Sequence, residues 1–228
     1  MNNIAIIPCR RNSKEVKNKN IKIFNKKPLL YWTIKSARSS SLISKVFVTS
    51  DSKKILKYAQ KYGAIPIKRP KKLANDNSTS EDALLHAIKK INLNFKNVIF
   101  LQATSPLRKK NDITNAIRLF EKGKYDSLFS SSLASSLFLW KYINKNMKII
   151  ENSKEIRKPR QKVKNKYLEN GSLYIFKKKG FLKHKNRFFG KIGTYVMNKN
   201  YSYEIDSKDE FKLLEFISNN LIKNEKNK

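Results

Sequence analysis

Positively charged side chains gather in the loop that follows the first apolar run of the chain. Residues 4–7 are nearly continuous in hydrophobicity, as in a buried parallel strand, and Pro8 ends the run because it has no N–H for strand pairing. The loop after it offers cations and a hydroxyl, namely Arg10, Ser13, Lys14 and Lys19. Loops after the strands of open α/β sheets bind phosphate groups, so this loop is a candidate phosphate site. From these residues alone, a solvated lysine-rich loop without a function explains the pattern equally well.

Two carboxylates near the other end of the chain could hold a metal ion. Glu204 and Asp206 are separated by one residue, which places both on one face of an extended segment. In so basic a protein, paired carboxylates indicate a divalent cation bound together with phosphates, and oxygen ligands favour Mg²⁺. Two histidines and one cysteine do not make a zinc cage. The alternative is that Asp206 only begins the last helix, where the helix dipole favours a carboxylate.

Two further polar loops follow apolar runs. Residues 68–80 come after Ile67 and contain Arg69 and Ser80, and residues 102–108 come after another short run and contain Gln102 and Thr104. Ligands bind beyond the carboxyl ends of the strands in open α/β sheets, so both loops are candidate binding loops. The alternative is that their hydroxyls cap helices and turns. For Asp51, which also follows a strand, we expect only a cap on the next helix.

Strands and helices alternate over the first 131 residues. We expect strands at residues 4–8, 46–48, 65–67, 98–102 and 127–131, and helices at residues 28–39, 53–62, 78–91 and 111–122. Capping boxes at residues 78–81 and 207–210 predict the starts of the third helix and of a last helix that ends near Ile222. This alternation predicts an α/β fold with a mostly parallel sheet and helices on both of its faces.

The pattern changes after residue 131. Residues 137–143 and 147–150 suggest a hairpin, and strands follow at 173–176 and 194–197. We therefore expect a single domain over residues 1–222, with residues 132–170 inserted as an arm or lid, and a polar tail over 223–228. The inserted segment could pair with a second subunit.

The composition is strongly basic, with 51 Lys and Arg against 17 Asp and Glu and a formal net charge of +34. Such a charge attracts nucleic acid, but the cations are spread along the whole chain, so small anionic substrates fit equally well. The single cysteine, Cys9, excludes a disulfide within the chain, and no apolar run is long enough to cross a bilayer. We therefore expect a cytoplasmic protein without a membrane segment.

The motifs, taken in order, resemble those of the acylneuraminate (CMP-sialic acid) cytidylyltransferases. The resemblance rests on residues 6–14 with 19–21, 27–30, 69–70 with 73–74 and 76, 101–108, 159–161, 170–175 and 205–206. Each match is weak alone, but together they follow the family's order over almost the whole chain. The resemblance implies a Rossmann-like nucleotidyltransferase fold, usually dimeric. It implies a reaction in which CTP and a nonulosonic acid give a CMP-sugar and pyrophosphate with Mg²⁺.

The resemblance also implies a role for individual residues. The triphosphate and the leaving pyrophosphate would be held by Arg10, Lys14 and Lys19. The nucleotide would be contacted by Ser13, Asn20, Arg69 and Ser80. The sugar site would be lined by Gln102, Thr104, Arg160, Tyr174, Phe188 and Phe189, and magnesium would be held by Glu204 and Asp206.

The chain departs from the family's pattern at four places. Arg11-Asn12 stands where most members have two glycines, Glu15 and Lys17 replace a glycine and a proline, and Glu204 replaces an aspartate. Leu168-Glu169 stands where some sialic acid enzymes carry an arginine, which leaves the acceptor open between sialic acid, legionaminate and another sialic-like acid. The opening loop disfavours a KDO cytidylyltransferase. A basic nucleic-acid-binding protein would explain the charge but not the ordered motifs, and a nucleotide-binding relative without turnover is a further alternative.

Overall fold

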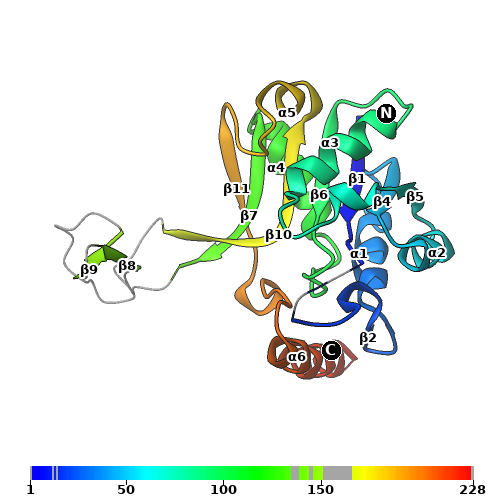
Figure 1. The fold of residues 1–228 in the computed structure, drawn as a ribbon. Coiled ribbons are helices and arrows are strands. Elements are labelled where there is room, and N and C mark those ends of the chain that lie inside the picture. Colours follow the sequence, from blue (N-terminus) through cyan, green and yellow to red (C-terminus); the bar gives the residue numbers. More distant parts are fainter. Residues whose placement is uncertain are drawn as a thin grey trace.

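A seven-stranded sheet forms the centre of the molecule (Figure 1). The computed structural model describes residues 2–11, 13, 15–134, 139–143, 146–150 and 166–226. In spatial order the strands are β11 (Ile192–Val196), β7 (Ser127–Leu133), β10 (Tyr167–Lys177), β6 (Asn97–Leu101), β1 (Asn3–Pro8), β4 (Lys45–Ser50) and β5 (Ile65–Lys68). Only β10 runs antiparallel to its neighbours in this sheet. The predicted mostly parallel α/β fold is therefore confirmed.

Helices cover both faces of the sheet. The helices are α1 (Leu29–Arg38), α2 (Lys53–Lys61), α3 (Ser80–Lys90), α4 (Asp112–Lys122), α5 (Lys178–His184) and α6 (Lys208–Lys226). Side chains of α1, α2 and α4 pack into one buried cluster with the alternate residues Ala5 and Ile7 of β1. Those of α3 and α5 pack into a second cluster with Ile4 and Ile6. Since successive strand side chains point to opposite faces, a strand that is apolar throughout must be covered on both sides.

The last helix, α6, forms a third cluster that ties the end of the chain to its beginning. Phe211 and Leu214 of α6 pack with Phe24, Leu29 and Ile205. Phe24 belongs to the short strand β2 (Ile23–Phe24), which pairs with β3 (Lys27–Pro28), and Figure 1 shows α6 beside β2. This packing fixes the segment that carries Glu204 and Asp206.

The predicted helix starts differ in accuracy. The capping box at residues 207–210 is confirmed, because the Ser207 Oγ accepts from the Glu210 N–H and Glu210 Oε2 accepts from the Ser207 N–H. The box at residues 78–81 is wrong by one residue: Thr79 caps α3 and pairs reciprocally with Asp82. The sequence holds the same spacing of hydroxyl and carboxylate in two registers, and only the packing of α3 selects one. The helix α6 also continues through Lys226.

Strands β7 and β10 extend into the segment expected to be an insertion. Leu133 pairs with Tyr167 and Ser132 with Leu168, so both ends of that segment belong to the sheet. Beyond them the hairpin of β8 (Trp140–Ile143) and β9 (Asn146–Ile149) lies far from the body of the molecule (Figure 1). The expected hairpin is thus confirmed over these strands. No helix within the described part of the chain is long and apolar enough to cross a membrane.

Candidate active site

The loops that follow the parallel strands enclose a cavity of about 470 Å³. The cavity lies at the edge of the sheet where β1 and β6 end, as the rule for open α/β sheets predicts. Of the predicted site residues, the ones that line it are Arg10, Ser13, Lys19, Asn20, Arg69, Ser80, Gln102, Thr104 and Asp206. Residues from both ends of the chain thus meet in one place. Lys14 and Arg160 lie outside the described residues.

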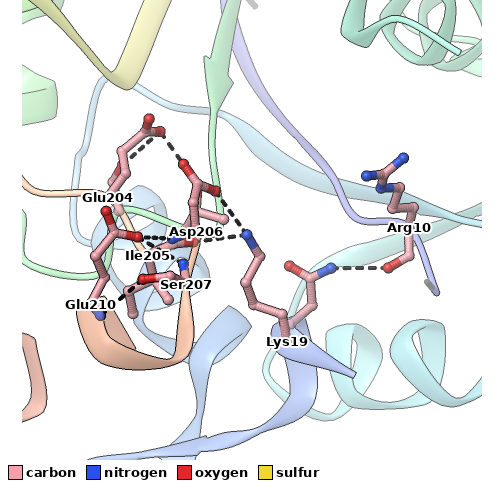
Figure 2. A network of polar contacts seen from close by, with 10 residues as sticks. Arg10, Lys19, Glu204, Ile205, Asp206, Ser207 and Glu210 are labelled. Carbon is pink, nitrogen blue, oxygen red and sulfur yellow. Dashed lines mark hydrogen bonds and ion pairs between the residues drawn. The ribbon is translucent and has the colours of Figure 1, made fainter. Parts of the chain in front are cut away.

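Lys19 joins the opening loop to the carboxylate segment. Its Nζ donates to the Ile205 carbonyl at 2.8 Å and to Asp206 Oδ1 at 2.9 Å, and Figure 2 shows the side chain pointing toward Asp206. The residue begins a short 3₁₀ turn, Lys19–Ile21, and the next residue, Asn20, donates to the Arg10 carbonyl at 3.0 Å. Because Asn20 is buried, this bond fixes Arg10 and Lys19 relative to each other. The predicted phosphate loop is therefore an ordered structure at these residues.

Two aspartates bind residues of the opening loop. The Arg11 N–H donates to Asp51 Oδ1 at 2.8 Å, and Arg10 pairs with Asp76 at 3.1 Å. The expectation that Asp51 caps the next helix is wrong, because Ser52 caps α2 through the Ile55 N–H. A cap one residue later frees the Asp51 carboxylate to accept a backbone N–H of the loop. This bond anchors the loop at Arg11.

Arg69 brings a buried cation to the wall of the cavity. It is 5% exposed, and its Nη2 donates to the Cys9 carbonyl at 3.1 Å. Burial lowers its pKa, and its Nε has no hydrogen-bond partner among the described residues. A buried N–H without an acceptor is energetically costly, so this guanidinium is suited to donate a hydrogen bond to a ligand. Burial also raises the pKa of Cys9 to about 12, so this thiol is not a nucleophile.

Glu204 lies deeper than Asp206 and is held by two hydroxyls. Its Oε1 accepts from Thr104 at 3.4 Å and from Ser105 at 3.5 Å. Gly171 has a φ of +64°, and a Cβ there would lie 2.2 Å from Glu204 Oε1. The glycine therefore permits both the turn and the close approach of the carboxylate. Burial, followed by the negative charge of Asp206, raises the pKa of Glu204 to about 7.

The donor set around Asp206 fits a magnesium ion. Two carboxylates and a threonine hydroxyl supply oxygen ligands, and the Asp206 side chain is exposed. The described residues contain no cluster of three or more His, Cys, Asp or Glu that could enclose a metal. Mg²⁺ commonly takes one or two carboxylates and fills its other positions with phosphate oxygens and water, so two carboxylates suffice.

The predicted sugar residues are placed at different depths. Gln102 and Thr104 line the cavity, whereas Tyr174 stacks behind Phe100, a cavity residue, with ring centroids 5.1 Å apart. Phe188 meets Tyr174 edge to face at 6.0 Å. Phe189 packs in the core instead, stacked on His184 at 5.4 Å and 9% exposed. The Tyr174 hydroxyl donates to Glu169 Oε1, and burial followed by this bond raises the pKa of Tyr174.

Arg108 is a structural residue whose role the sequence did not indicate. Its Nη2 donates to the carbonyls of Gln102 at 2.8 Å and Ser172 at 2.5 Å, and its Nη1 donates to Thr33 at 3.0 Å. These bonds join the loop after β6 to β10 and α1. Burial lowers the pKa of Arg108 to about 10, so ordering this loop costs the desolvation of a cation. Only its place at the end of the 102–108 loop could have suggested it.

Comparisons with known proteins agree with this geometry. A sequence model of the cytidylyltransferase family matches residues 4–227. The N-acylneuraminate cytidylyltransferase of Escherichia coli O18:K1:H7 is 35% identical over 92% of this chain, which spans about half of that protein. The CMP-N,N'-diacetyllegionaminic acid synthase of Campylobacter jejuni is 32% identical over 94% of both chains.

A solved structure supports the fold independently. The CMP:2-keto-3-deoxy-manno-octonic acid synthetase complexed with CTP superposes with a TM-score of 0.73, covering 96% of this chain and 99% of that one. At 15% identity this likeness shows the fold alone. The family model matches nearly all residues of the chain, and the likeness to this solved structure agrees with the fold that the motifs imply. The chain belongs to the cytidylyltransferase family.

Proposed function

We propose that this protein transfers CMP from CTP to the anomeric hydroxyl of a nonulosonic acid and releases pyrophosphate. The observation that carries the proposal is the contact between Lys19 and Asp206, which brings the cations of the opening loop and the Asp206 carboxylate into one cavity. Relatives whose names specify sialic, legionaminic and pseudaminic acids support this class of acceptor. The acceptor of this chain is a sialic acid or a sialic-like acid such as legionaminate.

The reaction needs positioning and charge stabilisation more than a covalent catalyst. The anomeric oxygen attacks the α-phosphorus, a new O–P bond forms, and the bond to the leaving pyrophosphate breaks while the hydroxyl proton passes to solvent. Negative charge then develops on the phosphoryl oxygens and on pyrophosphate. Arg10 and Lys19 point cations at this region, and Arg69 and Asn20 offer donors to the nucleotide. Ser13 and Ser80 lie along the same wall.

Glu204 and Asp206 are the residues that would hold Mg²⁺. The ion, when bound, supplies positive charge to the phosphate oxygens and to the leaving group. Asp206 lines the cavity, and its carboxylate is exposed enough to share a cation with a nucleotide. Glu204 stands behind it, fixed by Thr104 and Ser105. The longer glutamate arm keeps the ligand chemistry of the aspartate that relatives carry there.

Pyrophosphate release tests the proposal. The assay combines CTP and Mg²⁺ with N-acetylneuraminate, a legionaminate or a pseudaminate, and omits each component in turn. Release is expected only when CTP, Mg²⁺ and an acid are all present. Asp206→Asn is expected to abolish this metal-dependent release, with Asp209→Asn, in the first turn of α6, as the matched control. A wild-type protein that binds CTP but releases no pyrophosphate with any acid would show that the chain binds nucleotide without turnover.

We also propose that a second copy of this chain covers the arm formed by the ends of β7 and β10 and the hairpin β8–β9. Its apolar side chains are more than half exposed at Leu133, Tyr142, Met147, Ile150 and Leu168. An apolar surface of this kind on a strand pair that projects from the body is typical of an interface between subunits. Sedimentation of the wild type is expected to give a dimer, and Tyr142→Glu with Met147→Glu a monomer. A wild-type monomer at working concentration contradicts this proposal.

A further inference from the structure

Arg187 forms a two-bond ion pair with Glu81 beside the candidate active site. Its Nε lies 2.7 Å from Glu81 Oε1 and its Nη2 lies 3.1 Å from Glu81 Oε2. Only 15% of the Arg187 side chain and 22% of the Glu81 side chain are exposed. The pair joins the segment after α5 to the first turn of α3, two elements that are 106 positions apart in the sequence.

The guanidinium also covers the aromatic wall of the cavity. Its Cζ lies 4.9 Å from the centre of the Phe100 ring and 4.6 Å from that of Tyr174. Phe100 lines the cavity, and so does Ser80, the neighbour of Glu81. Arg187 therefore lies against residues that form the wall of the cavity, on the side of Phe100 and the first turn of α3.

A purely structural role explains this pair poorly. Desolvating two charges costs about as much as their attraction returns, and apolar residues of similar size often stabilise a protein equally well. Around Arg187 the rings of Phe100, Tyr174 and Phe188 already form a well-packed apolar cluster. A guanidinium placed over these rings adds directed N–H donors to a surface that otherwise offers only apolar contact.

The charges around Arg187 select the kind of group that it can bind. Glu81 already neutralises the guanidinium, and Glu169 accepts a hydrogen bond from Tyr174, whose ring the guanidinium faces. A carboxylate of the ligand would meet these two acidic side chains, whereas a neutral carbonyl oxygen would not. The two bonds to Glu81 use Nε and Nη2, and an arginine carries five N–H donors in all. Donors beside aromatic rings suit an amide carbonyl that carries a small alkyl group.

We infer that Arg187, fixed by Glu81, is a specificity-determining residue that donates a hydrogen bond to the acylamino carbonyl of the acceptor sugar. The inference rests on the proposed function, because it concerns the acceptor of that reaction. It gives Arg187 no part in the chemistry at phosphorus.

Two acceptors that differ at one group test the inference. N-acetylneuraminate is compared with its analogue in which a hydroxyl replaces the acetamido group. Arg187→Met is expected to lower kcat/KM for N-acetylneuraminate by about 10- to 100-fold, the loss typical of a hydrogen bond to a charged group. For the hydroxyl analogue kcat/KM should change by less than about threefold, and the KM for CTP should not change. The matched control is Arg118→Met, which removes an exposed arginine of α4 on the other side of the sheet.

The possible outcomes separate the two proposals. An equal loss with both acceptors, or no loss with either, overturns the role of Arg187 and leaves the proposed function intact. No turnover of either acceptor by the wild type, with CTP bound, overturns the proposed function and this inference with it. If Arg187→Met does not fold, the wild type is tested with the free-amine analogue of N-acetylneuraminate. This analogue has no acyl carbonyl to accept the hydrogen bond, so its kcat/KM should be well below that of N-acetylneuraminate. Turnover equal to that of N-acetylneuraminate refutes the inference.

Discussion

Replacing Glu204 by glutamine is expected to stabilise the metal-free protein at alkaline pH, although it removes a residue of the proposed metal site. Burial and the charge of Asp206 raise the pKa of the Glu204 carboxyl from 4.5 to about 7. A carboxyl whose pKa is raised by folding contributes stability below its unfolded pKa and loses it as pH rises through the folded pKa. The loss therefore begins near pH 4.5 and is complete above about pH 7. Glutamine keeps the acceptor for Thr104 and Ser105 and never ionises.

The size of this effect follows from the two pKa values. Each pH unit of difference corresponds to about 1.4 kcal/mol, so a rise from 4.5 to about 7 costs the wild type about 3 kcal/mol at high pH. The free energy of unfolding, measured with urea in the presence of a chelator, should thus be nearly equal for wild type and Glu204→Gln at about pH 4.5. At about pH 8.5 the variant should be more stable by up to about 3 kcal/mol, a rise of several degrees in Tm.

Glu210 supplies a control of opposite sign. Backbone N–H groups of Ser207 and Asp206 lower its pKa, so its contribution to stability is present above its unfolded pKa and is lost as pH falls. Glu210→Gln should therefore destabilise the protein at neutral pH. A difference between wild type and Glu204→Gln that does not depend on pH, or a less stable variant at about pH 8.5, would refute the buried, high-pKa state of Glu204.

Three further substitutions probe the site and its support. Gly171→Ala should lower the free energy of unfolding by about 1–2 kcal/mol, because residue 171 has a positive φ. The alanine methyl group would also displace Glu204, so the Mg²⁺ concentration needed for turnover should rise. An unchanged Mg²⁺ requirement contradicts this. Arg108→Met should lower the free energy of unfolding by about 3–5 kcal/mol, since two backbone carbonyls each lose a hydrogen bond from a charged donor; a loss below about 1 kcal/mol in a urea titration contradicts this. Lys19→Met should slow pyrophosphate release by about 100- to 1,000-fold, while the Tm stays near that of the wild type. A wild-type rate of release in this variant would exclude Lys19 from the phosphate site.

Most of the fold could be predicted because it depends on local pattern. The strand that ends at Pro8 and the helix of residues 29–38 are recognisable from continuous hydrophobicity and from helical periodicity. The helix α5 was not predicted, because its seven residues are mostly basic and hold few apolar positions. The N-cap of α3 is Thr79, one residue after the predicted Ser78, because the local sequence allows the capping box in two registers.

The site could be predicted only as separate parts. Cations and hydroxyls after each strand indicate which loops carry it, and the order of motifs indicates the family. The contacts that assemble the loops connect residues far apart in the sequence, such as Lys19 with Asp206 and Arg187 with Glu81. Asp51 looked like a helix cap and instead holds the Arg11 N–H. Such pairs depend on which strands lie side by side, and no local pattern reveals them.

The most direct test of the proposed reaction is ³¹P NMR of one reaction mixture that contains the protein, CTP, Mg²⁺ and a nonulosonic acid. The signals of CTP should be replaced by equal amounts of inorganic pyrophosphate and of a single phosphodiester phosphorus, that of the CMP-sugar. Both products should be absent when the acid is omitted. Loss of CTP to free CMP, or CTP signals that persist with every acid while CTP is bound, would contradict the assignment of this cavity to CMP transfer.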